Sequence, residues 1–313
     1  MDDKTVRCAE PDARRAAQGP GAEGQRGPGV GFRPVVAGMR WLLSAAAVLV
    51  LLAGIQLFVF TGHTGQFFAW TIANPLAATF LGAAYWAAVP LEALAARQPR
   101  WANARIAVPA VLTFTVLTLA ATLTHLDQLH LGAAFAIGTQ VVTLAWIVIY
   151  IAVPALLVIL LAAQARTPGT DPPRTTTLPT WLSATLAAQA IIMLALGTAL
   201  YAVPRPTAPL WPWTLTPMMA QATGAWLIAL AVAAGHALAE RDPRRLRPAA
   251  AGYLLLAVLL AIALARYPHQ FHWRTAPATL YLIFLATMVL TGTAGLAQSR
   301  PRTAPSASRP GRR

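Results

Sequence analysis

The chain has 313 residues, of which 57% are hydrophobic and only 11% are charged, whereas a soluble globular domain carries roughly 25% charged residues. This composition excludes an ordinary soluble fold and predicts an integral membrane protein. Five of the 10 acidic residues lie within the first 23 positions, so few carboxylates remain for catalysis. The net charge of +14 comes from basic residues in tails and short loops, a distribution that favours membrane topology over nucleic-acid binding.

Eight long apolar stretches follow one another along the chain, each bounded by proline, glycine or charge. A bilayer core about 30 Å thick requires roughly 20 apolar residues in a helix, and each stretch is close to that length. They are 41–60, 75–96, 106–124, 139–163, 181–201, 217–239, 249–266 and 278–297. The sequence therefore predicts an all-α membrane protein with eight transmembrane helices. Because a long polar tail precedes the first stretch, we expect an uncleaved first span rather than a signal peptide.

The basic residues predict the orientation of the spans, because Lys and Arg are enriched in cytoplasmic loops. Of the 24 Lys and Arg residues, all but Arg205, Arg266 and Arg274 lie in the two tails or in the loops after even-numbered spans. This distribution predicts that both termini are cytoplasmic. The Ala, Arg and Pro bias is typical of a high-GC bacterial genome, so we expect the bacterial inner membrane, with the lipid bilayer as partner and no nucleic acid.

The most informative pattern is a match between the two halves of the chain at a fixed offset of 142 residues. Between 75–130 and 217–272 about a quarter of the positions are identical without a gap, which favours an internal duplication. The pairs of positions joined by this offset include Asn74 and Thr216, Gly82 and Gly224, Arg105 and Arg247, Gln128 and Gln270, and His130 and His272. Each half then holds four spans, so both halves enter the membrane in the same direction and form parallel repeats.

The duplication also predicts the domain organisation. We expect a disordered basic tail at 1–38, a first four-helix repeat at 39–163, a cytoplasmic linker at 164–180, a second four-helix repeat at 181–298 and a disordered basic tail at 299–313. Asn74 and Thr216 are predicted to cap the second helix of each repeat, each followed by proline at the first helical position. Gly82 and Gly224 lie on small-residue faces that allow another helix to approach closely.

Five of the six histidines map to outer loops or to the outer ends of the third and seventh spans. Imidazole is a common transition-metal ligand, so these residues suggest a metal or haem site. Its candidate ligands are His125, His130, His269 and His272. Their spacing matches no closed zinc pattern. Interfacial anchoring is the simpler interpretation, and a polar vestibule for a solute is a third.

Ionisable residues are rare within the spans, and an intramembrane charge is a functional candidate. Glu92 and His236 lie near the inner ends of the second and sixth spans, where they could pair with each other or reach the cytoplasmic headgroups. The two capped helix starts, with three arginines on the same side, suggest an anion site as an alternative to ordinary capping. The candidate solute-lining residues are Asn74, Thr79, Gly82, Glu92, Thr216, Gln221, Gly224 and His236.

The sequence carries no G-x-S-x-G, H-E-x-x-H or Walker motif, so we expect neither a hydrolase nor an ATPase and assign no catalytic residue. The pattern best fits a small-solute permease or channel-like protein with a polar lining between the second and sixth spans. One alternative is a membrane protein that holds a metal or haem at the outer histidines. The other is a non-catalytic assembly or scaffold subunit, which would require a homo-oligomer or a membrane partner.

Overall fold

A computed structural model describes residues 31–174 and 177–299. The chain divides into residues 1–31 and 32–313, and all the helices below belong to the second unit. Most of the two predicted tails, residues 1–30 and 300–313, therefore lie outside the described residues. The predicted disorder of the tails stays a prediction.

Eight long helices make up the described part of the second unit. They are α1 (Ala37–Gly54), α3 (Pro75–Ala96), α5 (Ala107–Thr124), α6 (Ile137–Ala165), α7 (Thr180–Ala202), α9 (Pro217–Glu240), α10 (Arg247–Arg266) and α11 (Ala276–Gln298). Each is long and apolar enough to cross a membrane, α1 together with a π-helical turn that extends it to Val59. This result confirms the prediction of an all-helical chain with eight candidate spans.

Short helical turns connect several of the long helices. The α-helical turns are α2 (Thr64–Phe67), α4 (Trp101–Ala104) and α8 (Pro204–Thr207). The 3-10 turns are η2 (Thr61–His63), η3 (Leu126–Gln128), η4 (Ala208–Leu210) and η5 (Pro268–Gln270). Such tight turns satisfy backbone groups at helix ends, which have no partners within the helix.

The predicted helix starts are confirmed at α3 and α9. The Asn74 side chain accepts hydrogen bonds from the backbone N–H groups of Leu76 at 2.9 Å and Ala77 at 3.3 Å. The Thr216 hydroxyl accepts one from the N–H of Met219 at 3.3 Å. Each cap precedes a proline at the first helical position, where the missing N–H has no helical partner to lose.

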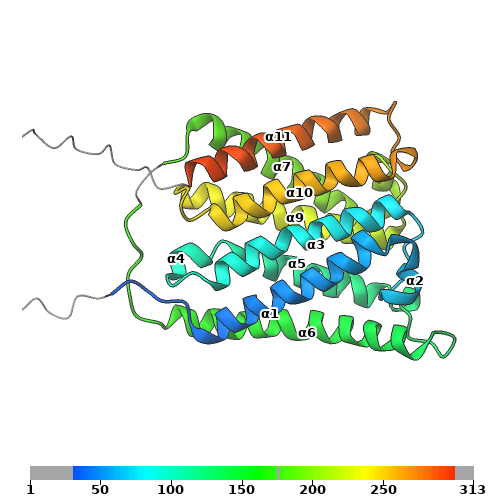
Figure 1. Ribbon diagram of the computed structural model, residues 1–313, viewed down its shortest axis with the longest axis horizontal. Coiled ribbons are helices and arrows are strands. Elements are labelled where there is room, and N and C mark those ends of the chain that lie inside the picture. Colours follow the sequence, from blue (N-terminus) through cyan, green and yellow to red (C-terminus); the bar gives the residue numbers. More distant parts are fainter. Residues whose placement is uncertain (1–30, 175–176, 300–313) are drawn as a thin grey trace, which may run out of the picture. The chain divides into compact units, whose positions relative to one another are not determined.

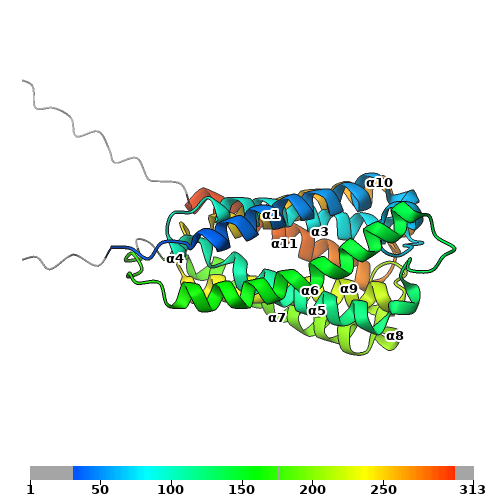
Figure 2. The ribbon, with the colours of Figure 1, turned by 90° about the horizontal axis from the view of Figure 1, so that it is seen from below.

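The helices pack in two sets of neighbours (Figures 1 and 2). α3 lies against α1 and α10, while α9 lies against α7 and α5. α5 in turn packs on α6, and α10 packs on α11. α3 is the most enclosed of the eight, with 72% of its span residues buried, whereas only 22–28% are buried in α6, α7 and α11. The apolar exposed surfaces fit a chain surrounded by lipid.

Glycines allow two of these helix pairs to approach closely. A Cβ atom on Gly82 of α3 would lie 2.5 Å from the backbone nitrogen of Phe58. A Cβ atom on Gly224 of α9 would lie 2.6 Å from the carbonyl oxygen of Gly197 in α7. Both glycines therefore admit the backbone of the preceding long helix, as the small-residue pattern predicted.

Candidate functional site

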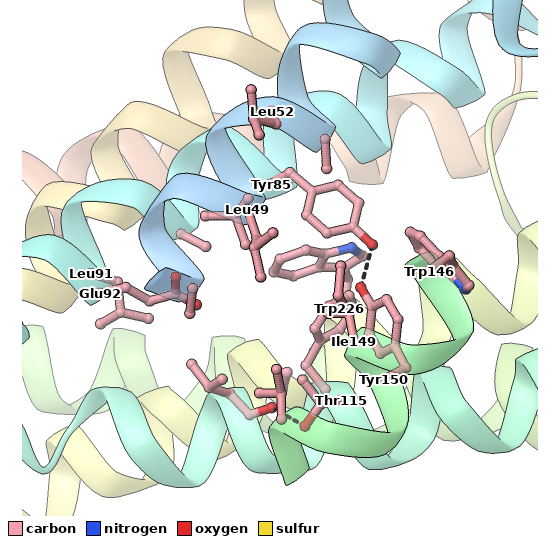
Figure 3. A pocket seen from close by; sticks show the side chains of 18 of the residues that line it. Leu49, Leu52, Tyr85, Leu91, Glu92, Thr115, Trp146, Ile149, Tyr150 and Trp226 are labelled. Atoms are coloured by element: carbon pink, nitrogen blue, oxygen red, sulfur yellow. Dashed lines mark hydrogen bonds between the residues drawn. The ribbon is translucent and has the colours of Figure 1, made fainter. Parts of the chain in front are cut away.

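An apolar cavity lies among five helices, α1, α3, α5, α6 and α9. It encloses about 270 Å³, and Figure 3 shows many of its side chains. Aliphatic residues form most of the wall, among them Leu49, Leu52, Leu91 and Ile149. The polar groups come from Gln56, Tyr85, Glu92, Thr115 and Tyr150, together with the indoles of Trp146 and Trp226. A largely apolar cavity with a few convergent polar groups is the usual form of a small-molecule site.

Glu92 is the acidic residue of the cavity wall. It is 2% exposed, and its Oε2 atom has no hydrogen-bond partner among the described residues. No Lys, Arg or His belongs to the described lining of the cavity. Burying a carboxyl group without a partner is energetically costly, so Glu92 provides an unused acceptor or donor for a ligand.

An aromatic wall lies across the cavity from Glu92 (Figure 3). The hydroxyl groups of Tyr85 and Tyr150 are hydrogen-bonded to each other at 2.7 Å. The ring of Tyr85 meets Trp226 edge to face at a centroid distance of 5.2 Å, and Tyr150 packs on Trp146 at 4.4 Å. Trp226 also lies over Phe114 at 3.9 Å. These contacts hold several aromatic rings at one end of the cavity.

The cavity reaches the outer surface of the helix bundle between α1 and α6. Leu52 of α1 is 52% exposed, and Ala145 of α6 is also exposed, although both line the cavity. The two helices touch at a different level, where Gly38 meets Leu160 and the amide of Gln164 accepts a hydrogen bond from the N–H of Val36 at 2.9 Å. The opening therefore faces sideways, toward the surface that lipid would cover.

A buried polar contact joins α7 and α11. The Gln189 amide of α7 donates a hydrogen bond to the hydroxyl of Thr287 at 2.9 Å and lies 3.5 Å from the hydroxyl of Thr291. Buried polar contacts of this kind hold membrane helices together. The seam between α1 and α6 borders the cavity that contains Glu92.

Of the eight residues predicted to line a solute path, Glu92 lines this cavity. Asn74 and Thr216 act as caps, and Gly82 and Gly224 lie against backbone, as described above. The Thr79 hydroxyl donates to the carbonyl of Pro75 at 2.7 Å, and the Gln221 amide donates to the carbonyl of Tyr201 at 3.1 Å. The structure therefore does not gather the eight residues into one site.

His236 does not approach Glu92 as a partner. Its Nε2 atom lies 3.5 Å from the carboxylate of Glu240, one turn further along α9. Glu92 instead faces the cavity and is shielded from solvent. The structure thus realises neither of the two interpretations made for Glu92 from the sequence, pairing with His236 or extension to the headgroups.

The four outer histidines are spread over separate environments. His130 is 2% exposed, and its ring nitrogens lie 2.9 Å from the carbonyl of Phe68 and 3.0 Å from the hydroxyl of Thr71. His125 is half-buried, whereas His269 and His272 are exposed. Among the described residues no group of three His, Cys, Asp or Glu side chains could hold a metal ion. The metal or haem site stays a prediction, without a ligand set in the described part of the chain.

The aromatic wall was missed in the sequence. Trp and Tyr are enriched at the ends of membrane spans, whereas Tyr85, Trp146, Tyr150 and Trp226 all lie within α3, α6 and α9. Aromatic residues away from span ends were the available signal. Their meeting in one cavity depends on three helices that are distant in sequence.

Comparisons of the chain with protein-family models, with curated proteins and with solved structures found no match.

Proposed function

We propose that this protein is a permease-like carrier that takes a lipophilic cation from the bilayer into the cavity between α1, α3, α5, α6 and α9. The observation that carries the proposal is the buried carboxyl group of Glu92 opposite an aromatic wall, in a cavity that opens sideways. A membrane-soluble ligand reaches such an opening without crossing the loops.

The chemistry of the cavity favours a cation. A cation would give the Glu92 carboxylate the partner it lacks, and the faces of Tyr and Trp rings attract cations when water is excluded. The aliphatic part of the wall suits the apolar body of the same ligand. An anion, which the capped helix starts had suggested, would meet a carboxyl group and no basic side chain among the described lining residues.

The proposed function has a direct test in ligand binding. We expect purified protein to bind tetraphenylphosphonium, a lipophilic cation, and Glu92→Gln to weaken binding about tenfold, equal to about 1.4 kcal/mol. Gln keeps the shape of the side chain but not its charge. The measurement is equilibrium binding of the labelled cation in detergent, followed by its uptake into proteoliposomes.

A matched control is Asp127→Asn, which neutralises an exposed carboxylate in the loop between α5 and α6. This variant should bind the cation as the unaltered protein does. Equal affinity in the Glu92→Gln variant, or the same loss in both variants, would contradict the proposal. Binding without uptake would contradict the carrier function and leave only binding of the cation.

We also propose that the chain consists of two parallel four-helix repeats. The helix neighbours support this. If each helix is replaced by the one four spans further along the chain, counting on from the first span after the eighth, the α1–α3 pair becomes α7–α9 and the α3–α10 pair becomes α9–α5. All four pairs are in contact. Hydrogen bonds add further support. The N–H of Val35 donates to the carbonyl of Pro99 at 3.2 Å, and the N–H of Leu178 donates to that of Arg241 at 3.1 Å. The acceptors Pro99 and Arg241 are 142 positions apart, and the donors Val35 and Leu178 are 143 positions apart.

A second local match involves side chains. Asn103 donates a hydrogen bond to Gln98 at 3.3 Å, and Arg245 donates one to Glu240 at 2.8 Å. The offset of 142 joins position 98 to 240 and position 103 to 245. The same contact is thus an amide pair in one half and an ion pair in the other, as expected for diverged copies of one ancestral loop.

The proposed orientation, with both termini cytoplasmic, can be tested with Cys8, the single cysteine of the chain. A membrane-impermeant maleimide should label Cys8 only after the cells are permeabilised. As a control, Asp127→Cys in a Cys8→Ser background should be labelled in intact cells, because this loop is expected outside. Labelling of Cys8 in intact cells would reverse the orientation without affecting the proposal for the cavity.

A further inference from the structure

A second cavity of about 110 Å³ lies among α3, α7, α9, α10 and α11. Its wall is apolar and includes Leu178 just before α7, Leu182 in its first turn, Ala237 near the end of α9 and Leu246 in the loop before α10. The cavity therefore lies toward the end of the bundle that carries the α9–α10 loop. Gln189 of α7 contacts Thr291 of α11, a residue of this wall, at 3.5 Å.

The two cavities occupy equivalent positions in the two halves of the chain. Most residues that line the second cavity lie 142 positions from a residue that lines the first. The matched pairs, first cavity before second, include Ala110 and Gly252, Phe114 and Leu256, Val153 and Gly295, and Ala229 and Ala87. The two cavities also share Ala88, Leu91, Trp226, Leu230 and Ala233, the wall formed where α3 and α9 meet.

The polar groups of the two cavities differ at equivalent positions. Ala234 stands in the second cavity where Glu92 stands in the first, so no carboxyl group belongs to its described lining. Conversely, Tyr253 stands where the first cavity has Val111. The hydroxyl of Tyr253 is buried and has no hydrogen-bond partner among the described residues. The second cavity therefore offers a hydrogen-bond donor within apolar walls.

We propose that the second cavity is a distinct site that holds one acyl chain of an anionic phospholipid, with an ester carbonyl accepting a hydrogen bond from Tyr253. The apolar wall suits the chain, and the unpaired hydroxyl suits the ester. Arg244 and Arg247 are exposed on either side of the lining residue Leu246, where they favour an anionic headgroup. This assignment is independent of the ligand that the first cavity takes.

The test uses a phosphatidylglycerol that carries a photoactivatable diazirine in one acyl chain. The full-length protein is reconstituted into phosphatidylcholine vesicles that contain a small fraction of this lipid, irradiated and digested. We expect mass spectrometry to find crosslinks on the α7, α10 and α11 peptides that line the second cavity. The same diazirine on a phosphatidylcholine chain should label these peptides more weakly.

Matched variants separate the two cavities. Ala234→Leu and Glu92→Leu place the same side chain at equivalent positions of the two halves. Ala234→Leu should lower labelling of the second-cavity peptides about tenfold because it occupies the space of the chain, whereas Glu92→Leu should leave it unchanged. Tyr253→Phe should lower labelling about fivefold, within the range expected for one hydrogen bond. Tyr281→Phe, which lies outside both cavity walls, should have no effect.

Two outcomes would overturn the assignment. One is labelling of the second-cavity peptides that persists in Ala234→Leu, and the other is labelling that falls equally in Tyr253→Phe and Tyr281→Phe. Equal labelling by the two lipid headgroups would exclude the anionic preference. Because tetraphenylphosphonium binding tests Glu92 separately, failure of either proposal remains distinguishable from failure of the other.

Discussion

Replacing Gly224 by leucine is expected to abolish the observed packing of α9 on α7. Even a Cβ atom at this position would lie 2.6 Å from the carbonyl oxygen of Gly197 and 2.9 Å from the backbone nitrogen of Tyr201. Both are backbone atoms of one helix, so no side-chain rotation can relieve the contact. We expect a loss of at least about 3 kcal/mol, at or beyond the upper end of ordinary overpacking. Thermal unfolding of the detergent-purified protein measures the loss of stability. The yield of monodisperse protein gives a second measurement.

Gly235, in the same helix, supplies the control for this prediction. It is exposed, and a Cβ atom placed on it would meet nothing within 4 Å. Gly235→Leu should therefore leave stability unchanged or raise it slightly, since leucine favours helix more than glycine does. Gly82→Leu should behave as Gly224→Leu does, because its Cβ atom would meet the backbone of Phe58. Similar melting temperatures for Gly224→Leu and Gly235→Leu would refute the close approach of α7 and α9.

The second large effect is expected when Glu240, at the end of α9, is changed to alanine. The Glu240 side chain is 4% exposed and forms ion pairs with Arg105 and Arg245, the latter at 2.8 Å. Arg105 also pairs with Asp171 at 2.6 Å. Removing the carboxylate leaves two guanidinium groups close together, one of them only 5% exposed. Breaking a buried pair on one side costs about 3–5 kcal/mol. Because Asp242 stays 3.7 Å from Arg245, we expect a destabilisation at the lower end of that range.

The cluster joins distant parts of the chain, so its loss should also loosen their association. Arg105 precedes α5, Asp171 lies between α6 and α7, and Glu240 ends α9. We therefore expect Glu240→Ala to speed proteolysis at residues 166–174, as well as lowering the melting temperature. Both readings come from one purified sample, by limited proteolysis and by thermal unfolding.

Gln98→Ala is the matched control, since Gln98 lies 142 positions before Glu240 and its amide makes two neutral contacts, with Asn103 at 3.3 Å and with the carbonyl of Leu94 at 3.2 Å. Their loss should cost about 1 kcal/mol or less, because the contacts are neutral and only partly buried. If Glu240→Ala were no more destabilising than Gln98→Ala, the ion-pair cluster would contribute no more than an ordinary surface contact.

The sequence by itself determined the number of long helices, most of their bounds and the caps at Asn74 and Thr216. These features are local: the length of an apolar stretch, a proline and a capping side chain act within one helix or at its end. The first helix begins at Ala37, four residues before the expected start, and the fourth begins at Ile137, two residues before it, since helix ends are the least certain part of a sequence-based assignment. The close approach at Gly224 could also be predicted from the sequence, because all the residues of a small-residue face lie in one helix.

Only the tertiary structure decided which polar groups meet. Glu92 was singled out from the sequence as an intramembrane charge, but the aromatic wall on the other side of its cavity comes from α3, α6 and α9. His236 had been considered as a partner for Glu92 and instead lies against Glu240. Which side chains meet in a cavity depends on how separate helices pack and on the rotation of each helix about its axis. When a helix is apolar on all sides, its hydropathy pattern carries little information about that rotation.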